Sequence, residues 1–404
     1  MPVMKNNATN MIYRRFGATE LQMPVFTCGG MRYQQGWQDD VFENIDAASQ
    51  ENLAACIQRA VACGINHIET ARGYGTSEIQ LGRVLPGLPR EQLIVQTKIG
   101  PKESEDEFLK VFDQSLSNLK LDYVDLLGIH GINNDELLAQ TLHGGTLRAA
   151  RKLQERGLVR HIGFSTHGPL PTILKTIESG EFSYVNLHWY YFDQWNRPAI
   201  DAATARDMGV FIISPNDKGG KLYSPPEKLT RLCEPLTPMG FNDLFCLAGS
   251  DVHTISLGIA KPQDLDAHLA VLPLIPEARQ RIAPIIQRLE AVFAEALGAD
   301  WAAQWNRGIP EIDDTPGKVP VYHIARMFGM AKAFDMHDYG KMRYNLLGNG
   351  GHWFAGAKAD ENTDWRALRQ RLSHHPLADR LVEAIREAHT LFNAEDQKRL
   401  SESE

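Results

Sequence analysis

The stretch LIVQTKIGPKESEDEFLKVFDQSLSNLKLDYVDLLGIHGI, residues 93–132, carries the pattern that decides the fold. Its two ends, 93–100 and 124–132, are dense in apolar and β-branched residues, which is typical of buried strands. The segment between them has helical spacing of its large apolar residues, namely Phe108, Phe112, Leu116 and Leu119. A strand, a helix and a second strand in this order predict a parallel pair, because a parallel connection must cross back over the sheet.

The same unit repeats along most of the chain. Candidate strands lie at 25–30, 67–71, 93–100, 124–132, 161–168, 184–191, 210–215 and 252–260. Further candidate helices lie at 51–63, 144–157, 170–179, 198–208, 240–249 and 262–271. Eight strand–helix units over roughly 250 residues favour a closed (β/α)8 TIM barrel over an open sheet. No G-x-G-x-x-G follows the first strand, which argues against a Rossmann domain.

The two ends of the barrel region have their own patterns. The segment IYRRFGATELQMPVF, 12–26, predicts an N-terminal hairpin that closes the bottom of the barrel. Strand signals stop after residue 272, and helical patterns continue to residue 404, with a packed glycine-rich and aromatic loop at 339–359. We therefore expect a barrel domain at 12–272 and a mostly helical C-terminal region at 273–404.

Composition limits the class of protein. The 404 residues carry a formal net charge of -8 without a basic block, so we expect no nucleic-acid partner. No apolar run reaches the length of a signal peptide or a membrane span, and we expect a cytoplasmic protein without membrane contact. The spacing of histidines and acids predicts no metal site. The five cysteines are expected to be free thiols: Cys28, Cys56, Cys63, Cys233 and Cys246.

Four polar residues fall where barrel strands end. Glu69 ends the second strand, Tyr74 follows it, Lys98 ends the third strand and His130 ends the fourth. The loops after the strands of such a barrel share one face, and active sites are found there. Satisfied polar residues at strand ends are the alternative, but four of them in this order favour a catalytic group.

The residue types suggest a reaction. A buried Lys98 needs a carboxylate partner, and Glu69 is one strand away. The cation is expected to lower the pKa of Tyr74 toward the working range, so that the phenol acts as a general acid. His130 can donate a hydrogen bond to a carbonyl oxygen and orient it. Together these groups can stabilise an alkoxide that develops during hydride addition.

These residues, with the strings Y-G-x-S-E-x-x-L-G (74–82), LDYVDLLGIH (121–130) and IGFS (162–165), resemble the aldo-keto reductase family. The resemblance covers residues 12–272. It implies an NAD(P)-dependent oxidoreductase that reduces an aldehyde, a ketone or a sugar-like carbonyl, with Tyr74 as the proton donor. The expected partner is therefore a small-molecule carbonyl substrate, while the oligomeric state is left open.

The resemblance also implies cofactor-binding residues. Ser165 and Asn186 correspond to the positions that hold the nicotinamide carboxamide. Ser214 begins the pyrophosphate loop, which continues through 215–220. The implied residues at this loop and at the adenine and ribose-phosphate end are Asn216, Lys218, Gly258, Lys261 and Asp264.

The sequence departs from the family pattern at several of these positions. The family usually has an aspartate where Glu69 stands, an asparagine at Thr166 and often an aromatic residue at Ile213. Asp264 replaces an arginine that often grips the 2′-phosphate of NADP, and Lys261 partly compensates. We expect a preference for NADP(H) over NAD(H). The departures leave an alternative, a reductase-like dinucleotide-binding sensory or regulatory protein with little turnover.

The C-terminal region carries a second resemblance. The run KMRYNLLGNGGHWFAGAKA (341–359) and REAHTLF (386–392) are similar to the tail of a bacterial subgroup of aldo-keto reductases that ends in a ferredoxin-like module. Iron–sulfur clusters need thiolate ligands, and the sequence has no cysteine after Cys246. We therefore expect a degenerate ferredoxin-like region without an Fe–S cluster, which serves as a scaffold or a lid.

Overall fold

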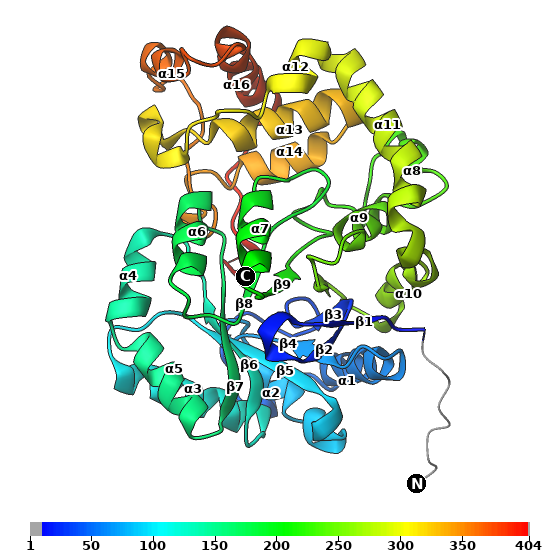
Figure 1. Cartoon of the computed structure of the whole chain (residues 1–404), viewed down its shortest axis with the longest axis vertical. Coiled ribbons are helices and arrows are strands. Elements are labelled where there is room, and N and C mark those ends of the chain that lie inside the picture. Colours follow the sequence, from blue (N-terminus) through cyan, green and yellow to red (C-terminus); the bar gives the residue numbers. More distant parts are fainter. Residues whose placement is uncertain (1–9, 403–404) are drawn as a thin grey trace. The chain divides into compact units, whose positions relative to one another are not determined.

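The structure is a computed structural model that describes residues 10–402. Eight parallel strands form a closed barrel in the order β10-β3-β4-β5-β6-β7-β8-β9. Their bounds are β3 Phe26–Gly29, β4 His67–Glu69, β5 Ile94–Ile99, β6 Val124–His130, β7 Val159–Ser165, β8 Tyr184–Leu187, β9 Gly209–Ile212 and β10 Thr254–Leu257. The predicted (β/α)8 barrel is confirmed, and each predicted strand overlaps one of these eight (Figure 1).

Helices follow nearly all barrel strands. They are α1 Ala47–Ala62, α2 Ser77–Leu81, α3 Glu105–Leu119, α4 Asp135–His143, α5 Thr146–Glu155, α6 Leu170–Glu178, α7 Arg197–Ala205, α9 Pro238–Leu247 and α10 Leu265–Leu269. Side-chain caps begin several of them: Asp46 accepts from the first turn of α1, and Ser104 does so for α3. Helix α4 was not predicted, although Asn134 caps it and acids fill its first turn.

The N-terminal hairpin is confirmed. Strands β1 (Tyr13–Arg15) and β2 (Gln22–Pro24) pair antiparallel around a turn at Gly17–Thr19. Phe16 and Met23 are fully buried in a cluster with side chains of the barrel strands, namely Ile94, Leu126, Tyr184 and Phe211. The hairpin therefore closes one end of the barrel by burying two large apolar side chains.

A polar layer lies inside the barrel. The Thr27 hydroxyl is 2.7 Å from Nδ1 of His67 and 2.8 Å from the Thr254 hydroxyl. Burial lowers the pKa of His67 from 6.5 to about 3, so the imidazole is neutral in the folded barrel. This layer therefore makes the stability of the barrel depend on pH.

The described chain divides into two compact units. The first runs through Tyr190 and adds Gln194–Asn216 and Asn242–Ala278. The second consists of Tyr191–Asp193, Asp217–Phe241 and Arg279–Glu404. The segments after β8 and β9 thus group with the C-terminal helices, which the periodicity of the sequence does not reveal.

The second unit is built from helices. They are α8 Glu227–Cys233, α11 Ala278–Leu297, α12 Ala299–Gln304, α13 Val321–Phe334, α14 His337–Tyr344, α15 Trp365–Arg371 and α16 Ala378–Phe392. Helix α13 is buried on nearly all sides, which is typical of the central helix of a helical core. The predicted helical C-terminal region is therefore present. Its ferredoxin-like character stays a prediction.

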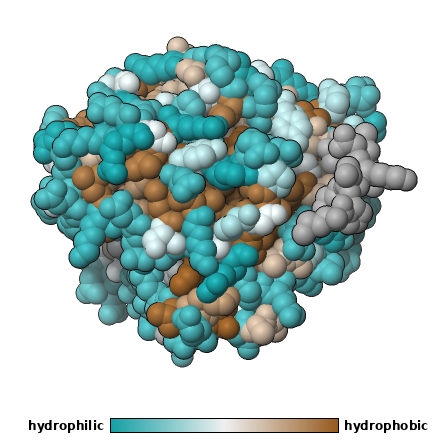
Figure 2. Space-filling model, turned by 90° about the horizontal axis from the view of Figure 1, so that it is seen from below, coloured by the Kyte–Doolittle hydropathy of each residue, from teal (hydrophilic) through white to brown (hydrophobic). Residues whose placement is uncertain are grey.

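The surface is mostly hydrophilic in the view of Figure 2, with hydrophobic residues visible between polar ones across the middle. Among the described residues, the exposed large hydrophobic side chains are Tyr13, Val41 and Tyr223. None of the helices within residues 10–402 combines the length and the apolarity that crossing a bilayer requires.

Candidate active site

The barrel brings the four predicted catalytic residues to one end. Glu69 is the last residue of β4, Lys98 is the last residue but one of β5, and His130 is the last residue of β6. These three strands are neighbours in the sheet, and Tyr74 lies in the turn that follows β4. The carboxyl ends of parallel barrel strands meet at one face, so the four side chains share it.

Lys98 and Glu69 form a buried ion pair. Their side chains are almost completely inaccessible, and Lys98 Nζ donates to Glu69 Oε1. Lys98 Nζ also donates to the carbonyl of Thr70 at 2.8 Å. On the neighbouring strand, a Cβ at Gly128 would lie 2.9 Å from Cγ of Lys98, so glycine leaves the room that the lysine stem occupies.

Tyr74 lies directly above this pair. Its hydroxyl is 3.5 Å from Glu69 Oε1, and Lys98 Nζ is 4.7 Å from the centroid of its ring. Burial raises the pKa of Tyr74 and lowers the pKa of Lys98. The expectation that the lysine lowers the tyrosine pKa is therefore wrong for the protein alone, because desolvation by burial raises that pKa. The phenol stays protonated at neutral pH.

Two rings hold the tyrosine in place. His130 meets it edge to face at 5.7 Å between centroids, and Trp37 does so at 6.1 Å. Trp37 belongs to the loop after β3, and the backbone carbonyl of Gly36 in that loop accepts from Thr76. Close approach of the two loops explains Gly75, which has φ 49° and where a Cβ would lie 2.1 Å from the Gly36 oxygen.

Ser165 and Asn186 lie side by side at the ends of β7 and β8. The Ser165 hydroxyl accepts from the backbone N–H of Gly131 at 3.1 Å. Asn186 is completely buried, and neither its amide oxygen nor its amide nitrogen has a hydrogen-bond partner within residues 10–402. A buried amide in this condition fits a ligand that supplies both a donor and an acceptor, as a carboxamide does.

The loop after β9 contains three of the residues implied by the resemblance. Ser214 has φ 53°, in the left-handed region. Asn216 Nδ2 is 3.1 Å from Nε2 of His268, whose Nδ1 is 2.5 Å from Asp243 Oδ2. Lys218 belongs to the second unit, where its carbonyl accepts from the Tyr339 hydroxyl at 2.7 Å.

The residues after β10 are more exposed. At Gly258 a Cβ would lie 3.1 Å from Cδ of Arg32, and Lys261 is exposed. Asp264 Oδ2 accepts from the backbone N–H groups of Ala260 and Lys261 at 2.8 and 3.1 Å. This carboxylate therefore closes its own turn, a role that the sequence reasoning did not foresee.

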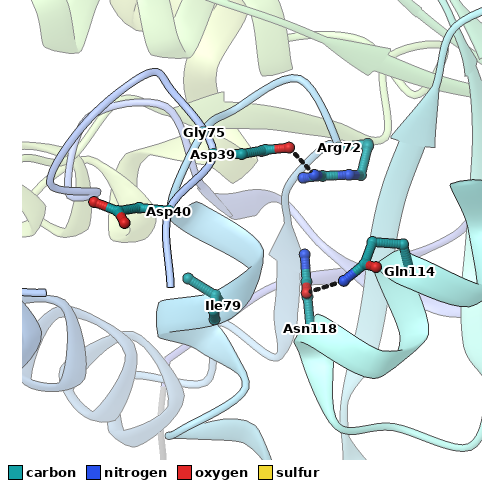
Figure 3. A pocket seen from close by; sticks show the side chains of 7 residues that line it. All are labelled: Asp39, Asp40, Arg72, Gly75, Ile79, Gln114 and Asn118. Carbon is teal, nitrogen blue, oxygen red and sulfur yellow. Dashed lines mark hydrogen bonds and ion pairs between the residues drawn. The ribbon is translucent and has the colours of Figure 1, made fainter. Parts of the chain in front are cut away.

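Sequence reasoning also missed two connected ion pairs beside the turn that contains Tyr74. Arg72 pairs with Asp39, and its Nη1 lies 3.6 Å from Oε2 of the buried Glu78. The feature of the sequence that could have indicated these ion pairs is Arg72, which lies between Glu69 and Tyr74. Figure 3 shows Arg72 with Asp39 at an open pocket of about 220 Å³. Its other lining residues are Asp40, Gly75, Ile79, Gln114 and Asn118.

Histidines at the ends of β7 and β8 also meet. Nε2 of His188 is 3.1 Å from Nδ1 of His167, and Nδ1 of His188 is 2.6 Å from the Tyr190 hydroxyl. His188 is partly exposed. Within residues 10–402, no group of three or more histidine, cysteine or acidic side chains is arranged to hold a metal ion.

The parallel barrel thus carries Glu69, Tyr74, Lys98 and His130 at the carboxyl ends of its strands. Residues 26–219, slightly less than half of the chain, match the Aldo/keto reductase family. Over these residues the chain is similar to that family.

Individual proteins named as reductases are similar to parts of the chain. An aldo-keto reductase from Mycobacterium sp. (strain JLS) is 34% identical over 122 residues, which cover 30% of this chain and 42% of that protein. The NADH-specific methylglyoxal reductase of Escherichia coli (strain K12) is 28% identical over 193 residues, covering 43% of this chain and 56% of that protein. The chain thus spans about two fifths to somewhat over half of the length of these relatives.

The fold has solved counterparts. The crystal structure of an aldo-keto reductase from Klebsiella pneumoniae in complex with NADPH superposes with a TM-score of 0.53 and 16% sequence identity. The match covers 67% of this chain and 94% of that chain. At this identity the likeness establishes the barrel fold alone.

Proposed function

We propose that the protein is an NAD(P)H-dependent oxidoreductase that reduces an aldehyde, a ketone or a sugar-like carbonyl, with Tyr74 as the general acid. The observation that carries the proposal is the buried Lys98–Glu69 ion pair directly beneath the Tyr74 ring. Burying two charges at a strand end has a large desolvation cost, and active sites are where such arrangements concentrate.

The residues present fit the nicotinamide cofactor. Asn186, with its unpartnered buried amide, and the neighbouring Ser165 would hold the carboxamide. The loop from Ser214 to Asn216 would hold the pyrophosphate. When bound, the reduced nicotinamide supplies the hydride for the carbonyl carbon.

The chain's own residues supply the rest of the reaction. His130 would donate a hydrogen bond to the carbonyl oxygen and orient it. As negative charge develops on that oxygen, Tyr74 transfers its phenolic proton to it. The ammonium group of Lys98, held 4.7 Å from the centroid of the tyrosine ring, then stabilises the phenolate that forms. The raised pKa of Tyr74 keeps the proton in place until the carbonyl arrives.

We also propose a preference for NADP(H) over NAD(H). Lys261 is exposed and offers a cation to a 2′-phosphate, and the hydrogen bonds from Ala260 and Lys261 occupy one oxygen of Asp264. The relatives differ here, since the Escherichia coli methylglyoxal reductase is NADH-specific and the Klebsiella pneumoniae structure holds NADPH. For the C-terminal region, we propose a helical scaffold without an Fe–S cluster.

Titration of the full chain with NADPH and with NADH, followed by tryptophan fluorescence, tests this function. We expect micromolar binding of NADPH, weaker binding of NADH, and oxidation of bound NADPH when a panel of aldehydes is added. Binding of neither dinucleotide at millimolar concentration would contradict the proposal. Tight binding without oxidation would favour the sensory alternative.

A further inference from the structure

One arginine in the second unit is buried without an acidic partner. Arg343, on α14, is 9% exposed, and its guanidinium carbon lies 4.0 Å above the centroid of the Phe354 ring. Its Nε is buried without a hydrogen-bond partner, and no carboxylate in residues 10–402 forms an ion pair with it. Buried arginines are normally paired, so this one indicates that an anion belongs beside it.

Other cations lie near Arg343. Arg399 lies over the ring of Trp353, 5.8 Å from its centroid, while Arg343 stacks on the next residue, Phe354. The Lys218 backbone is held by Tyr339, which precedes Arg343 by one helical turn and therefore shares its face of α14. Arg343 and Arg399 thus stack on two successive residues, and the Lys218 backbone is fixed to the same helix as Arg343.

Arg343 also acts on two buried titratable groups of the second unit. Burial lowers the pKa of Lys218 to about 7, and Arg343 and Arg399 lower it further, opposed by Asp217. Burial also lowers the pKa of His323 to about 4; Arg326 and Arg343 act in the same direction, and Asp193 opposes them.

The acids of this region have partners. Asp193 pairs with Arg326 at 3.2 Å, and Glu402 pairs with Arg399. Asp217 accepts from the Tyr223 hydroxyl at 3.0 Å. These contacts leave the charge of Arg343 without a carboxylate to balance it.

The geometry points to an anion-binding site in the second unit, formed by Arg343, Lys218 and Arg399, that takes the phosphate group of a phosphorylated small molecule. A guanidinium fork matches the oxygens of a phosphate. The stacking of Arg343 on Phe354 fixes the fork before the ligand arrives. This site does not depend on the proposed hydride transfer.

The test compares the full-length wild type with Arg343→Met in a buffer free of phosphate and sulfate. We expect the melting temperature of the wild type to rise as inorganic pyrophosphate is added, and that of Arg343→Met to rise less, because the loop proposed to hold the cofactor pyrophosphate remains in both proteins. Because Met removes an uncompensated charge and keeps an apolar contact with Phe354, the variant should melt no lower than the wild type without ligand. If Arg343 has a purely structural role, the variant should respond to pyrophosphate like the wild type and should melt at a lower temperature without ligand.

Two further variants complete the design. Arg386→Met is the matched control, since Arg386 also lies over an aromatic ring, 4.5 Å from the centroid of Trp365, but far along another helix. It should respond to pyrophosphate like the wild type. Arg399→Gln should weaken pyrophosphate binding several-fold, and it supports the site even if Arg343→Met fails to fold. An unchanged response of Arg399→Gln and Arg343→Met would overturn the proposal.

Calorimetric titrations with ribose 5-phosphate, NADPH and NADH separate two sources of the phosphate. Loss of NADPH binding in Arg343→Met with unchanged NADH binding assigns the site to the 2′-phosphate of the dinucleotide. Loss of ribose 5-phosphate binding alone assigns it to a separate phosphorylated metabolite. If the wild type binds none of pyrophosphate, ribose 5-phosphate and NADPH at millimolar concentration, the site does not exist.

Discussion

Glu69 stands where the resembling family usually has an aspartate, and the structure shows what the longer side chain does. It reaches Lys98 as a buried ion pair and leaves its Oε1 at 3.5 Å from the Tyr74 hydroxyl. Glu69 therefore pairs with Lys98, as its position one strand away predicts. The presence of glutamate in place of aspartate at position 69 therefore leaves the predicted catalytic residues together.

The pair should be costly to break. Glu69→Gln leaves the charge of Lys98 buried without a carboxylate, and we expect the free energy of unfolding to fall by about 3–5 kcal/mol. Urea denaturation measures this loss, with Glu69→Asp as a control that keeps the charge and should lose less. A Gln variant as stable as the wild type would show that Lys98 is neutral in the folded protein.

At the scale of elements, the turn after β4 and the loop after β3 fit against each other, and this contact fixes Tyr74. Two glycines flank the tyrosine and differ in their surroundings. Gly75 has φ 49° and lies against Gly36 and Trp37, whereas a Cβ at Gly73 would meet nothing within 4 Å.

This difference makes a paired prediction. Gly75→Ala should displace the Trp37 loop and cost at least about 1 kcal/mol of stability through backbone strain, with an additional loss from the clash. Gly73→Ala should leave stability and carbonyl reduction close to those of the wild type. Thermal melts and NADPH-dependent turnover of both variants check it, and equal effects of the two substitutions would contradict the close fit of the loops.

At the scale of the whole molecule, the polar layer inside the barrel makes stability depend on pH. The unfolded chain takes up a proton on His67 below about pH 6.5, whereas the folded barrel takes it up only near pH 3. Acid therefore favours the unfolded state, and the contribution of neutral His67 is complete above pH 6.5 and is lost as the pH falls toward 3.

His67→Gln should reduce this dependence, because an amide can still meet the Thr27 hydroxyl but does not titrate. We expect the stability of the wild type to fall more steeply between pH 6 and 4, by up to about 1.4 kcal/mol per pH unit relative to the variant. Denaturant titrations at several pH values give both slopes. Burial also lowers the pKa values of His253 and His323 to about 4. Both histidines remain in the two proteins, so their contributions cancel in the difference between the slopes. Parallel slopes would contradict a buried, neutral His67.

How far the sequence could predict this molecule depends on the range of the interactions. The eight strands follow from local apolar runs, and the placement of Lys98 and His130 follows from the rule that strand ends share a face. The raised pKa of Tyr74 could not be predicted, because it depends on burial by the distant Trp37 loop. The sequence equally could not predict that Arg343 is buried without an acidic partner, because this depends on how the side chains of the second unit pack.

The most direct test of the central claim is the reduction of methylglyoxal and 4-nitrobenzaldehyde by the wild type and by Tyr74→Phe, with NADPH oxidation as the readout. Phenylalanine keeps the ring contacts with His130 and Trp37 but removes the proton. We predict a loss of kcat by roughly 10²–10⁴-fold with NADPH affinity within about twofold of the wild type. Turnover of Tyr74→Phe equal to that of the wild type would contradict the assignment of Tyr74 as the general acid.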